Sequence, residues 1–155
     1  MNSFIRTLKH EGKIALREPS KVICYSYLEK SQESLRSARA LIKIKSYNDA
    51  VALTYYSMYH SATALLYLCG IKSENHAGTI ILLKELFGID NDSISQAKKE
   101  RVDKQYYVDF HANEKDVVAG IASAEQFNSV VKNRIDRIKN SEIKGIHEKA
   151  RVLLR

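Results

Sequence analysis

The segment from residue 47 to residue 69 is apolar on nearly every side, and it restricts the possible folds more than any other feature. Val51, Leu53, Tyr56 and Met58 already point in different directions around a helix. A helix without a polar face lies inside an assembly and contacts neighbours on several sides. The sequence therefore predicts a central helix surrounded by others.

Residues that form turns are scarce, with six glycines and one proline among 155 residues. This argues against a fold of many short strands and favours long helices with short connections. We expect helices over about 3–16, Pro19 to Lys45, 47–69, 76–87, 93–106, 113–140 and 143–153. The sequence therefore predicts an all-α bundle of four main helices with short flanking helices.

Several helix boundaries carry a local end signal. Asn, Asp or Ser before a helix satisfies free backbone N–H groups, and a left-handed Gly ends a helix. The expected signals are the Ser46–Asp49 pair, Gly70, Gly88, Asp92 and the Asn113–Asp116 pair. Each cap is worth only about 1 kcal/mol, so packing of the apolar stripes must supply most of the stability.

The helix expected after Pro19 has a helical seam with one interruption. Pro19 itself can occupy the first turn of this helix. Tyr25, Leu28, Leu35, Ala38 and Ile42 follow at three- and four-residue steps. Gln32 interrupts the seam, either as a polar group in a functional cleft or as a satisfied core amide, and we favour the core amide.

The charge and the cysteines indicate where the protein works. A formal net charge of +7 suits an acidic partner such as RNA, although solvated helix faces explain most of the basic residues. Cys24 and Cys69 lie far apart in apolar stretches, as buried reduced thiols of a cytosolic protein do. The most apolar stretch, residues 62–71, is shorter than the roughly 20 residues of a membrane-spanning helix. We expect a soluble, cytoplasmic protein that makes no membrane contact.

Three sequence blocks resemble the HEPN-domain family. The first is DAVALTYYSMYHSA, residues 49–62, which is similar to the second bundle helix of that family. The second is Gly70-Ile71 followed by His76-Ala77-Gly78, and the third is RVDKQY, residues 101–106, before a polar gap and a long helix. The resemblance covers about residues 20–138, so we expect one HEPN-like domain over 1–155. It is closest to small stand-alone HEPN proteins, many of which are paired with a nucleotidyltransferase in toxin–antitoxin modules.

The resemblance implies an up-and-down helical bundle that forms a homodimer. In active HEPN ribonucleases an Arg, four to six residues and a His form a site that is doubled across the dimer and works without metal. There a base takes the proton from the RNA 2′-hydroxyl group, which attacks the adjacent phosphate. The Arg stabilises the negative charge that develops.

This sequence departs from that motif after Arg101. The residue five positions on is Tyr106, beside Tyr107, and the next histidine is His111. In one continuous helix, ten residues rise about 15 Å, so His111 must fold back or come from the second subunit. Tyr106 is a poor base because a phenol has a pKa near 10, but it can donate hydrogen bonds or stack on a base. In some related toxins a Tyr near this motif accepts a nucleotide group, which makes Tyr106 and Tyr107 candidate acceptors.

The remaining candidates have plainer alternatives. We take Arg101, Tyr106 and His111 as catalytic candidates, and Tyr107, His60, His76 and Asp103 as binding candidates. For His60 we favour a role in the core or at an interface over a place near the cleft, and for His76 we favour a role in starting a helix over lining the site. A stacking platform for bases or ordinary core packing both explain Tyr55, Tyr56, Tyr59 and Tyr67, and we favour packing.

Other kinds of chemistry lack support in the sequence. No histidine pair has the spacing of a helical zinc site. Nucleophile-elbow, phosphate-loop and dinucleotide motifs are absent as well. We therefore expect no metal and no cofactor.

Three functional hypotheses follow. The first is an HEPN component of a toxin–antitoxin-type module that acts with a nucleotidyltransferase partner on RNA or nucleotides. The second is an active metal-independent endoribonuclease that uses Arg101 with His111 or His60. The third is a non-catalytic binding or scaffold module. We rank the second below the first because Tyr106 occupies the position of the motif histidine.

Overall fold

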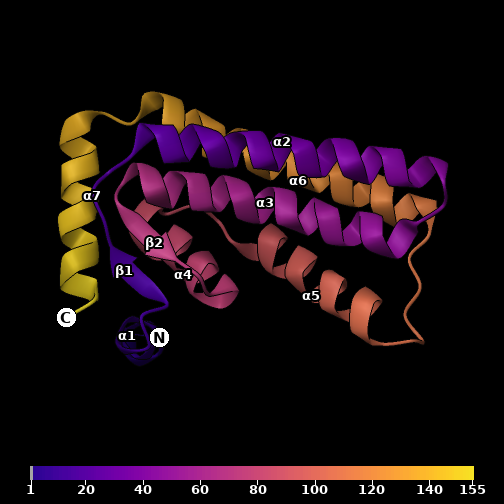
Figure 1. Ribbon diagram of the computed structural model, residues 1–155, viewed down its shortest axis with the longest axis horizontal. Coiled ribbons are helices and arrows are strands. Elements are labelled where there is room, and N and C mark those ends of the chain that lie inside the picture. The colour runs from indigo at the N-terminus through magenta and orange to yellow at the C-terminus, as the bar shows by residue number, and fades with distance from the viewer. Residues whose placement is uncertain (1) are drawn as a thin grey trace.

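The computed structural model describes residues 2–155 as seven helices and one small antiparallel sheet (Figure 1). In chain order the elements are α1 (Asn2–His10), β1 (Ile14–Leu16), α2 (Lys21–Lys43), α3 (Tyr47–Leu68), β2 (Ile71–Ser73), α4 (His76–Phe87), α5 (Asp92–Tyr106), α6 (Glu114–Arg137) and α7 (Asn140–Leu153). The predicted all-α bundle is confirmed. Its long helices are α2, α3, α5 and α6, while α1, α4 and α7 are shorter.

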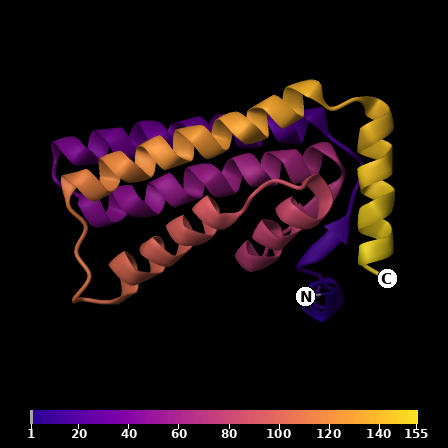
Figure 2. The same cartoon turned by 180° about the vertical axis from the view of Figure 1, so that it is seen from behind.

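Helix α3 is the centre of the bundle, as its apolar sequence predicts. It contacts α2, α6, α5, α4 and β2. Figure 1 shows α2 above it and α5 below it, and Figure 2, from behind, shows α6 running along both α2 and α3. Tyr55, Met58, Leu65 and Leu66 of α3 are among the most completely buried side chains.

The apolar stripe of α6 packs against α3. Asn113 and Asp116 form a capping box, in which each side chain accepts a hydrogen bond from the other's backbone N–H group, at 2.9 and 3.0 Å. The buried residues of this stripe are Val117, Ile121, Ala124, Phe127, Val131 and Ile135. Helix α6 ends at Arg137, and α7 folds across the end of the bundle (Figure 1).

A buried polar network joins α2, α3 and α6. The Ser31 hydroxyl group donates to the Ser57 carbonyl oxygen, and the Ser57 hydroxyl group donates to the Ser31 carbonyl oxygen, both at 2.8 Å. Asn128 of α6 donates to the Ser57 hydroxyl oxygen at 2.9 Å and accepts from Ser61 at 2.7 Å. Buried polar groups without such partners would cost stability, so this network fixes how the three helices align.

The N-terminal segment differs from its predicted helix. Helix α1 ends at His10, and Ala15, which falls within the helix expected over about 3–16, lies in strand β1. Gly12 adopts a left-handed conformation, φ 72°, that turns the chain. Residues 14–16 then pair with residues 71–73. A pairing between three-residue strands that lie far apart in the sequence leaves no periodic pattern to predict it from.

Helix α2 corrects three expectations. Pro19 lies before the helix, and Ser20 is the N-cap, whose hydroxyl oxygen accepts from the Ile23 N–H group at 3.1 Å. Tyr25 is 55% exposed and is not part of the core seam. Gln32 is also exposed, so the favoured interpretation as a core amide was wrong. The buried polar residue of this helix is Ser31, one position earlier.

The cap predictions were partly correct. Gly88 ends α4 in a left-handed conformation, φ 65°, as expected. Helix α3 begins after Ser46 as expected, but the Ser46 hydroxyl group donates to the Asp49 carboxylate instead of accepting a backbone hydrogen bond. The N-cap of α5 is Asn91, not Asp92, and the Asp92 N–H group donates to the Asp90 carboxylate.

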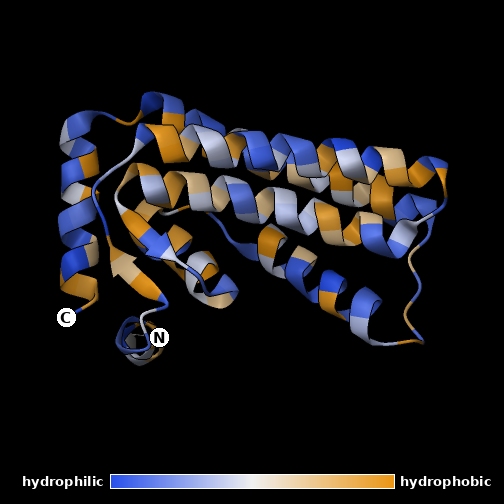
Figure 3. Cartoon of the chain, in the orientation of Figure 1, coloured by the Kyte–Doolittle hydropathy of each residue, from blue (hydrophilic) through white to orange (hydrophobic). Residues whose placement is uncertain are grey.

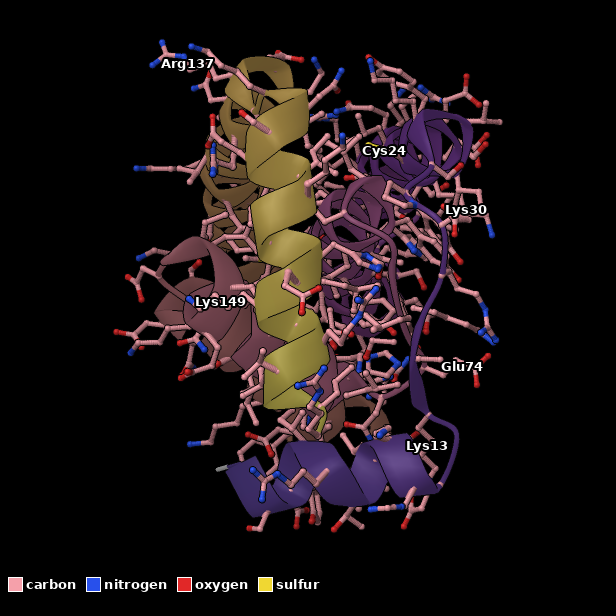
Figure 4. All side chains as sticks on the ribbon, turned by 90° about the vertical axis from the view of Figure 1, so that its left-hand side faces the viewer. Lys13, Cys24, Lys30, Glu74, Arg137 and Lys149 are labelled. Atoms are coloured by element: carbon pink, nitrogen blue, oxygen red, sulfur yellow. The ribbon has the colours of Figure 1, made fainter. Side chains whose placement is uncertain are left out.

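Both cysteines are buried and free, as predicted. Burial raises the pKa of the Cys24 thiol to about 11 and that of Cys69 to about 12, so both stay protonated at neutral pH. Hydrophilic residues line the outward sides of the peripheral helices (Figure 3), and Lys30 and Glu74 extend from the bundle where Figure 4 labels them. Within residues 2–155, no helix combines the length and apolar character needed to cross a membrane.

Gly70 is the turn residue on which the C-terminal end of α3 depends. Its φ is 73°, and an added Cβ atom would lie 2.3 Å from the Arg17 carbonyl oxygen and 2.8 Å from Nδ1 of His147. Gly88 has a similar φ of 65°, but there an added Cβ atom would meet no atom within 4 Å. Substitutions at these two glycines can therefore be compared to separate the effect of backbone strain from that of a steric clash.

We expect Gly70→Ala to lower the free energy of unfolding clearly more than Gly88→Ala does. A left-handed conformation costs a non-glycine residue about 1–3 kcal/mol, and the clash at Gly70 adds at least about 1 kcal/mol. Urea denaturation of both variants measures the difference. Equal losses of stability would contradict the close approach of Arg17 to Gly70.

Candidate functional site

Arg101 points from α5 onto the tyrosines of α3. Its Nη1 donates to the Tyr56 hydroxyl oxygen at 2.8 Å, and its Cζ lies 5.2 Å from the centre of the Tyr55 ring and 5.4 Å from that of Tyr56. Among residues 2–155 no carboxylate forms an ion pair with Arg101, and its buried Nε has no hydrogen-bond partner. The guanidinium group is held by aromatic contacts, and its charge is available to an anion.

His76, the first residue of α4, contacts the same tyrosines. Its Nδ1 lies 2.6 Å from the Tyr55 hydroxyl oxygen, and its ring stacks on Tyr59 with the ring centres 4.1 Å apart. Tyr55 is fully buried, and burial raises its pKa, so its phenol stays protonated. A protonated phenol can donate to Nδ1, which places the imidazole's own proton on Nε2. We call Arg101, Tyr55, Tyr56, Tyr59 and His76 the Arg101–His76 cluster.

The structure positions His76 through its neighbour Asn75. The Asn75 side chain accepts from the Gly78 N–H group at 2.8 Å and caps α4, which begins at His76. Tyr55 and Tyr59 are four residues apart and lie on one face of α3. A helix cap and a helical spacing together bring a ring from α4 onto two rings from α3.

The electrostatic setting keeps the two histidines of this region neutral. Burial, followed by the charges of Arg101 and Lys98, lowers the pKa of His76. Burial, followed by Lys30 and His76, lowers the pKa of His60. Unfolded imidazoles have a pKa near 6.5, so below that pH the unfolded chain binds more protons than the folded one. The free energy of unfolding from these two groups therefore falls as the pH decreases through this range.

His60 lies beside the cluster, within reach of three tyrosine rings. Its ring centre is 6.0 Å from that of Tyr27, 6.3 Å from Tyr56 and 6.1 Å from Tyr59. Its Nδ1 is buried and has no hydrogen-bond partner among the described residues. Of the four tyrosines that the sequence offered as a stacking platform, Tyr55 is core, whereas Tyr56, Tyr59 and Tyr67 are half-buried.

Tyr106, Tyr107 and His111 lie away from the cluster, at the C-terminal end of α5 and in the segment that follows. Tyr106 is 70% and Tyr107 56% exposed, and His111 is exposed as well. The His111 carbonyl oxygen accepts from Lys104 Nζ at 3.2 Å, and the next residue, Ala112, donates its N–H group to Asn48 of α3 at 2.8 Å.

This arrangement separates the sequence-derived candidates into two groups. Asn48, beside His111, and Tyr56, beside Arg101, are eight residues apart on α3, which is about 12 Å of helix rise. Arg101 therefore meets His76 of its own chain rather than His111. Asp103 belongs to neither group and lines a groove between α4 and α5.

Sequence reasoning missed the direct partners of Arg101 and His76. Tyr55 and Tyr56 appeared only as packing or stacking candidates, yet their hydroxyl groups hold His76 and Arg101. Two adjacent tyrosines on an otherwise apolar helix were the available signal, since buried hydroxyl groups need partners. Among residues 2–155, no three His, Cys, Asp or Glu side chains gather to hold a metal ion.

This bundle, with its tyrosine-rich central helix, matches a known protein family. A family model described as the HEPN domain matches residues 25–134, which is most of the chain. The chain belongs to the HEPN domain family. The matched range runs from α2 to α6 and so contains every residue of the Arg101–His76 cluster.

Three archaeal proteins are similar to this HEPN protein. A Methanocaldococcus jannaschii protein named "Putative toxin" is 31% identical over 121 residues, which cover 74% of this chain and 84% of the relative. A "UPF0332 protein" of Pyrococcus horikoshii is 36% identical over 63 residues, 41% of this chain and 42% of the relative. A "UPF0332 protein" of Archaeoglobus fulgidus is 24% identical and covers 71% of this chain and 93% of the relative.

The pKa of His76 tests the geometry of the cluster. We expect Arg101→Gln to raise the pKa of His76 because a nearby positive charge that disfavours the imidazolium is removed. The pKa should stay below the unperturbed value, since the ring is still partly buried. Titration of the imidazole ring protons by NMR measures this shift.

Lys99→Gln is the matched control for that titration. It removes one positive charge from the same helix, but Lys99 is not among the charges that act on His76. An unchanged pKa in Arg101→Gln, or equal shifts in both variants, would show that Arg101 does not lie against His76.

Proposed function

We propose that this HEPN protein is a component of a toxin–antitoxin-type module that acts on RNA or nucleotides together with a nucleotidyltransferase partner in the cytoplasm. The observation that carries the proposal is the Arg101–His76 cluster, in which an unpaired guanidinium group lies beside a neutral imidazole. The name "Putative toxin" of the Methanocaldococcus jannaschii relative supports the toxin-like part of the proposal.

In this proposal the cluster binds a phosphodiester of RNA. Arg101 pairs with a phosphate oxygen and stabilises the charge that builds up when the 2′-hydroxyl group attacks. His76 carries its proton on Nε2 when Tyr55 donates to Nδ1, so it can hydrogen-bond to a phosphate oxygen. The proton of the 2′-hydroxyl group goes to His60 or to His111 of a second copy of the chain, and the imidazolium that forms then protonates the leaving 5′-oxygen. The second copy makes the homodimer part of the proposal.

The exposed tyrosines suit the role of nucleotide acceptors. A nucleotidyltransferase can reach the Tyr106 and Tyr107 hydroxyl groups because both side chains are more than half exposed. The phenolic oxygen would attack the α-phosphate of a nucleoside triphosphate, form a phosphodiester and release pyrophosphate. The modification adds negative charge to the helix that carries Arg101, which gives the partner a way to suppress RNA binding.

A metal-independent endoribonuclease is the second candidate function. It is favoured specifically by the placement of His76 near Arg101, because an imidazole N–H group and a guanidinium group together can stabilise the charge that develops on the phosphate. A non-catalytic binding module would need the same Arg101 but not His76.

Cleavage of a mixed RNA pool in chelator distinguishes these candidates. We expect cleavage by the wild-type protein, a loss of at least about 100-fold in Arg101→Ala and His76→Phe, and no loss in the exposed α2 control Arg36→Ala. His111→Ala shows whether a second copy supplies a group. Cleavage that survives in His76→Phe would contradict the assigned role of His76. RNA binding without cleavage by the wild-type protein would exclude the ribonuclease and favour the non-catalytic binding module.

The partner hypothesis needs a separate measurement. We expect mass spectrometry to find a nucleotidyl group on Tyr106 or Tyr107 after incubation with a candidate nucleotidyltransferase and ATP. The double substitution Tyr106→Phe with Tyr107→Phe should abolish the modification, while Tyr25→Phe, which changes another exposed tyrosine, should not. A nucleotidyl group found only on other residues would argue against Tyr106 and Tyr107 as acceptors.

Expression of the chain alone should arrest growth, and co-expression of the nucleotidyltransferase partner should relieve the arrest.

A further inference from the structure

Helices α4 and α5 follow one another in the chain but diverge, and a groove of about 480 Å³ lies between them. Asn91, in the connection, lines the groove, and its Nδ2 donates to the Ile80 carbonyl oxygen at 3.1 Å. The lining residues are Ala77, Ile80, Ile81, Asn91, Ser95, Lys98, Lys99, Val102 and Asp103. The volume is in the range of small-molecule sites. We call this the α4–α5 groove.

The two walls of the groove are apolar. Ala77, Ile80 and Ile81 come from α4, and Val102 comes from α5. Ile80 is buried, whereas Ile81 and Val102 are half-buried and therefore accessible from the groove. Apolar side chains on two sides suit a flat ring, and nucleobases commonly bind between such walls.

The α4–α5 groove lies next to the Arg101–His76 cluster and has basic residues in its lining. Ala77 directly follows His76 and Val102 directly follows Arg101, and the charge of Lys98, which lines the groove, acts on His76. Lys98 and Lys99 lie on the same stretch of α5. Positive charge beside an apolar slot matches a ligand that joins a planar base to a phosphate.

Asp103 is the acidic residue among those that line the groove. A carboxylate accepts hydrogen bonds from the exocyclic amino group of a base, such as N4 of cytosine. Uracil has a carbonyl oxygen at that position, which a carboxylate repels. Asp103 therefore favours a base that carries an amino group.

We infer that the α4–α5 groove binds one nucleotide, with its base between Ile81 and Val102 and its phosphate toward Lys98 and Arg101. The nucleotide belongs either to the RNA at the cluster or to a free mononucleotide, and the first source rests on the proposed function. In either case the exocyclic amino group of the base lies at Asp103.

Binding of CMP and UMP by the purified protein tests the groove. We expect CMP to bind at least about fivefold more tightly than UMP, which is the lower end of base discrimination by one side chain. Asp103→Asn should remove most of this preference. Ile81→Trp, which fills the groove, should weaken the binding of both nucleotides at least tenfold. Lys84→Trp, at an exposed position on the same helix, is the matched control and should bind like the wild type.

Lys98→Glu provides a second variant if Ile81→Trp does not fold. It leaves the apolar walls intact but reverses a charge at the basic side, so it should weaken CMP more than cytidine, which has no phosphate. Wild-type affinity in Ile81→Trp and equal effects of Lys98→Glu on CMP and cytidine would both overturn the inference.

The source of the nucleotide is found with a second ligand. A short cytidine oligonucleotide without the attacking 2′-hydroxyl groups cannot be cleaved and should bind more tightly than CMP if RNA is the source. Tighter binding of CMP would assign the groove to a free mononucleotide. RNA cleavage that persists in Ile81→Trp with unchanged nucleotide affinity would refute the groove and leave the proposed function standing. Nucleotide binding in the groove without RNA cleavage would support the groove and refute RNA cleavage as the function.

Discussion

Burial of α3 on several sides is the constraint on which the rest of the structure depends. Most of this helix is apolar, and it contacts α2, α4, α5, α6 and β2 closely enough that its polar atoms must find partners inside the protein. Ser57 and Ser61 meet Ser31 and Asn128, which aligns α2 and α6. Tyr55 and Tyr56 meet His76 and Arg101, which aligns α4 and α5. The alignment of the helices and the candidate site thus both arise because the buried polar atoms of α3 need hydrogen-bond partners.

This origin explains why the candidate site is organised before any ligand binds. The guanidinium group of Arg101 is fixed by a hydroxyl group and two aromatic faces, and the ring of His76 is fixed by a hydrogen bond and a stacked ring. Fixed donors lose little freedom when they bind an anion. The more exposed Tyr106 and Tyr107 have no comparable support, which suits groups that a partner enzyme must reach.

Much of the fold followed from local sequence signals. The central position of α3, the stripe of α6 with its capping box, and the ends at Gly70 and Gly88 were all predictable, because each depends on residues within one or two turns. The strands β1 and β2 were not, since their pairing joins residues 14–16 to residues 71–73. The burial of Ser31 in place of Gln32 was missed because a single position shifts which side of α2 faces α3.

The sequence by itself determined the helices, the central helix and the presence of Arg101, the tyrosines and the histidines as chemical groups. Only the tertiary structure decided which histidine accompanies Arg101. Along the chain the next histidine is His111, but the segment after α5 carries it to the beginning of α3. His76, twenty-five residues before Arg101 in the sequence, reaches it because α4 and α5 both pack against the same turns of α3. Proximity in a helical bundle depends on shared packing partners, and sequence separation does not measure that.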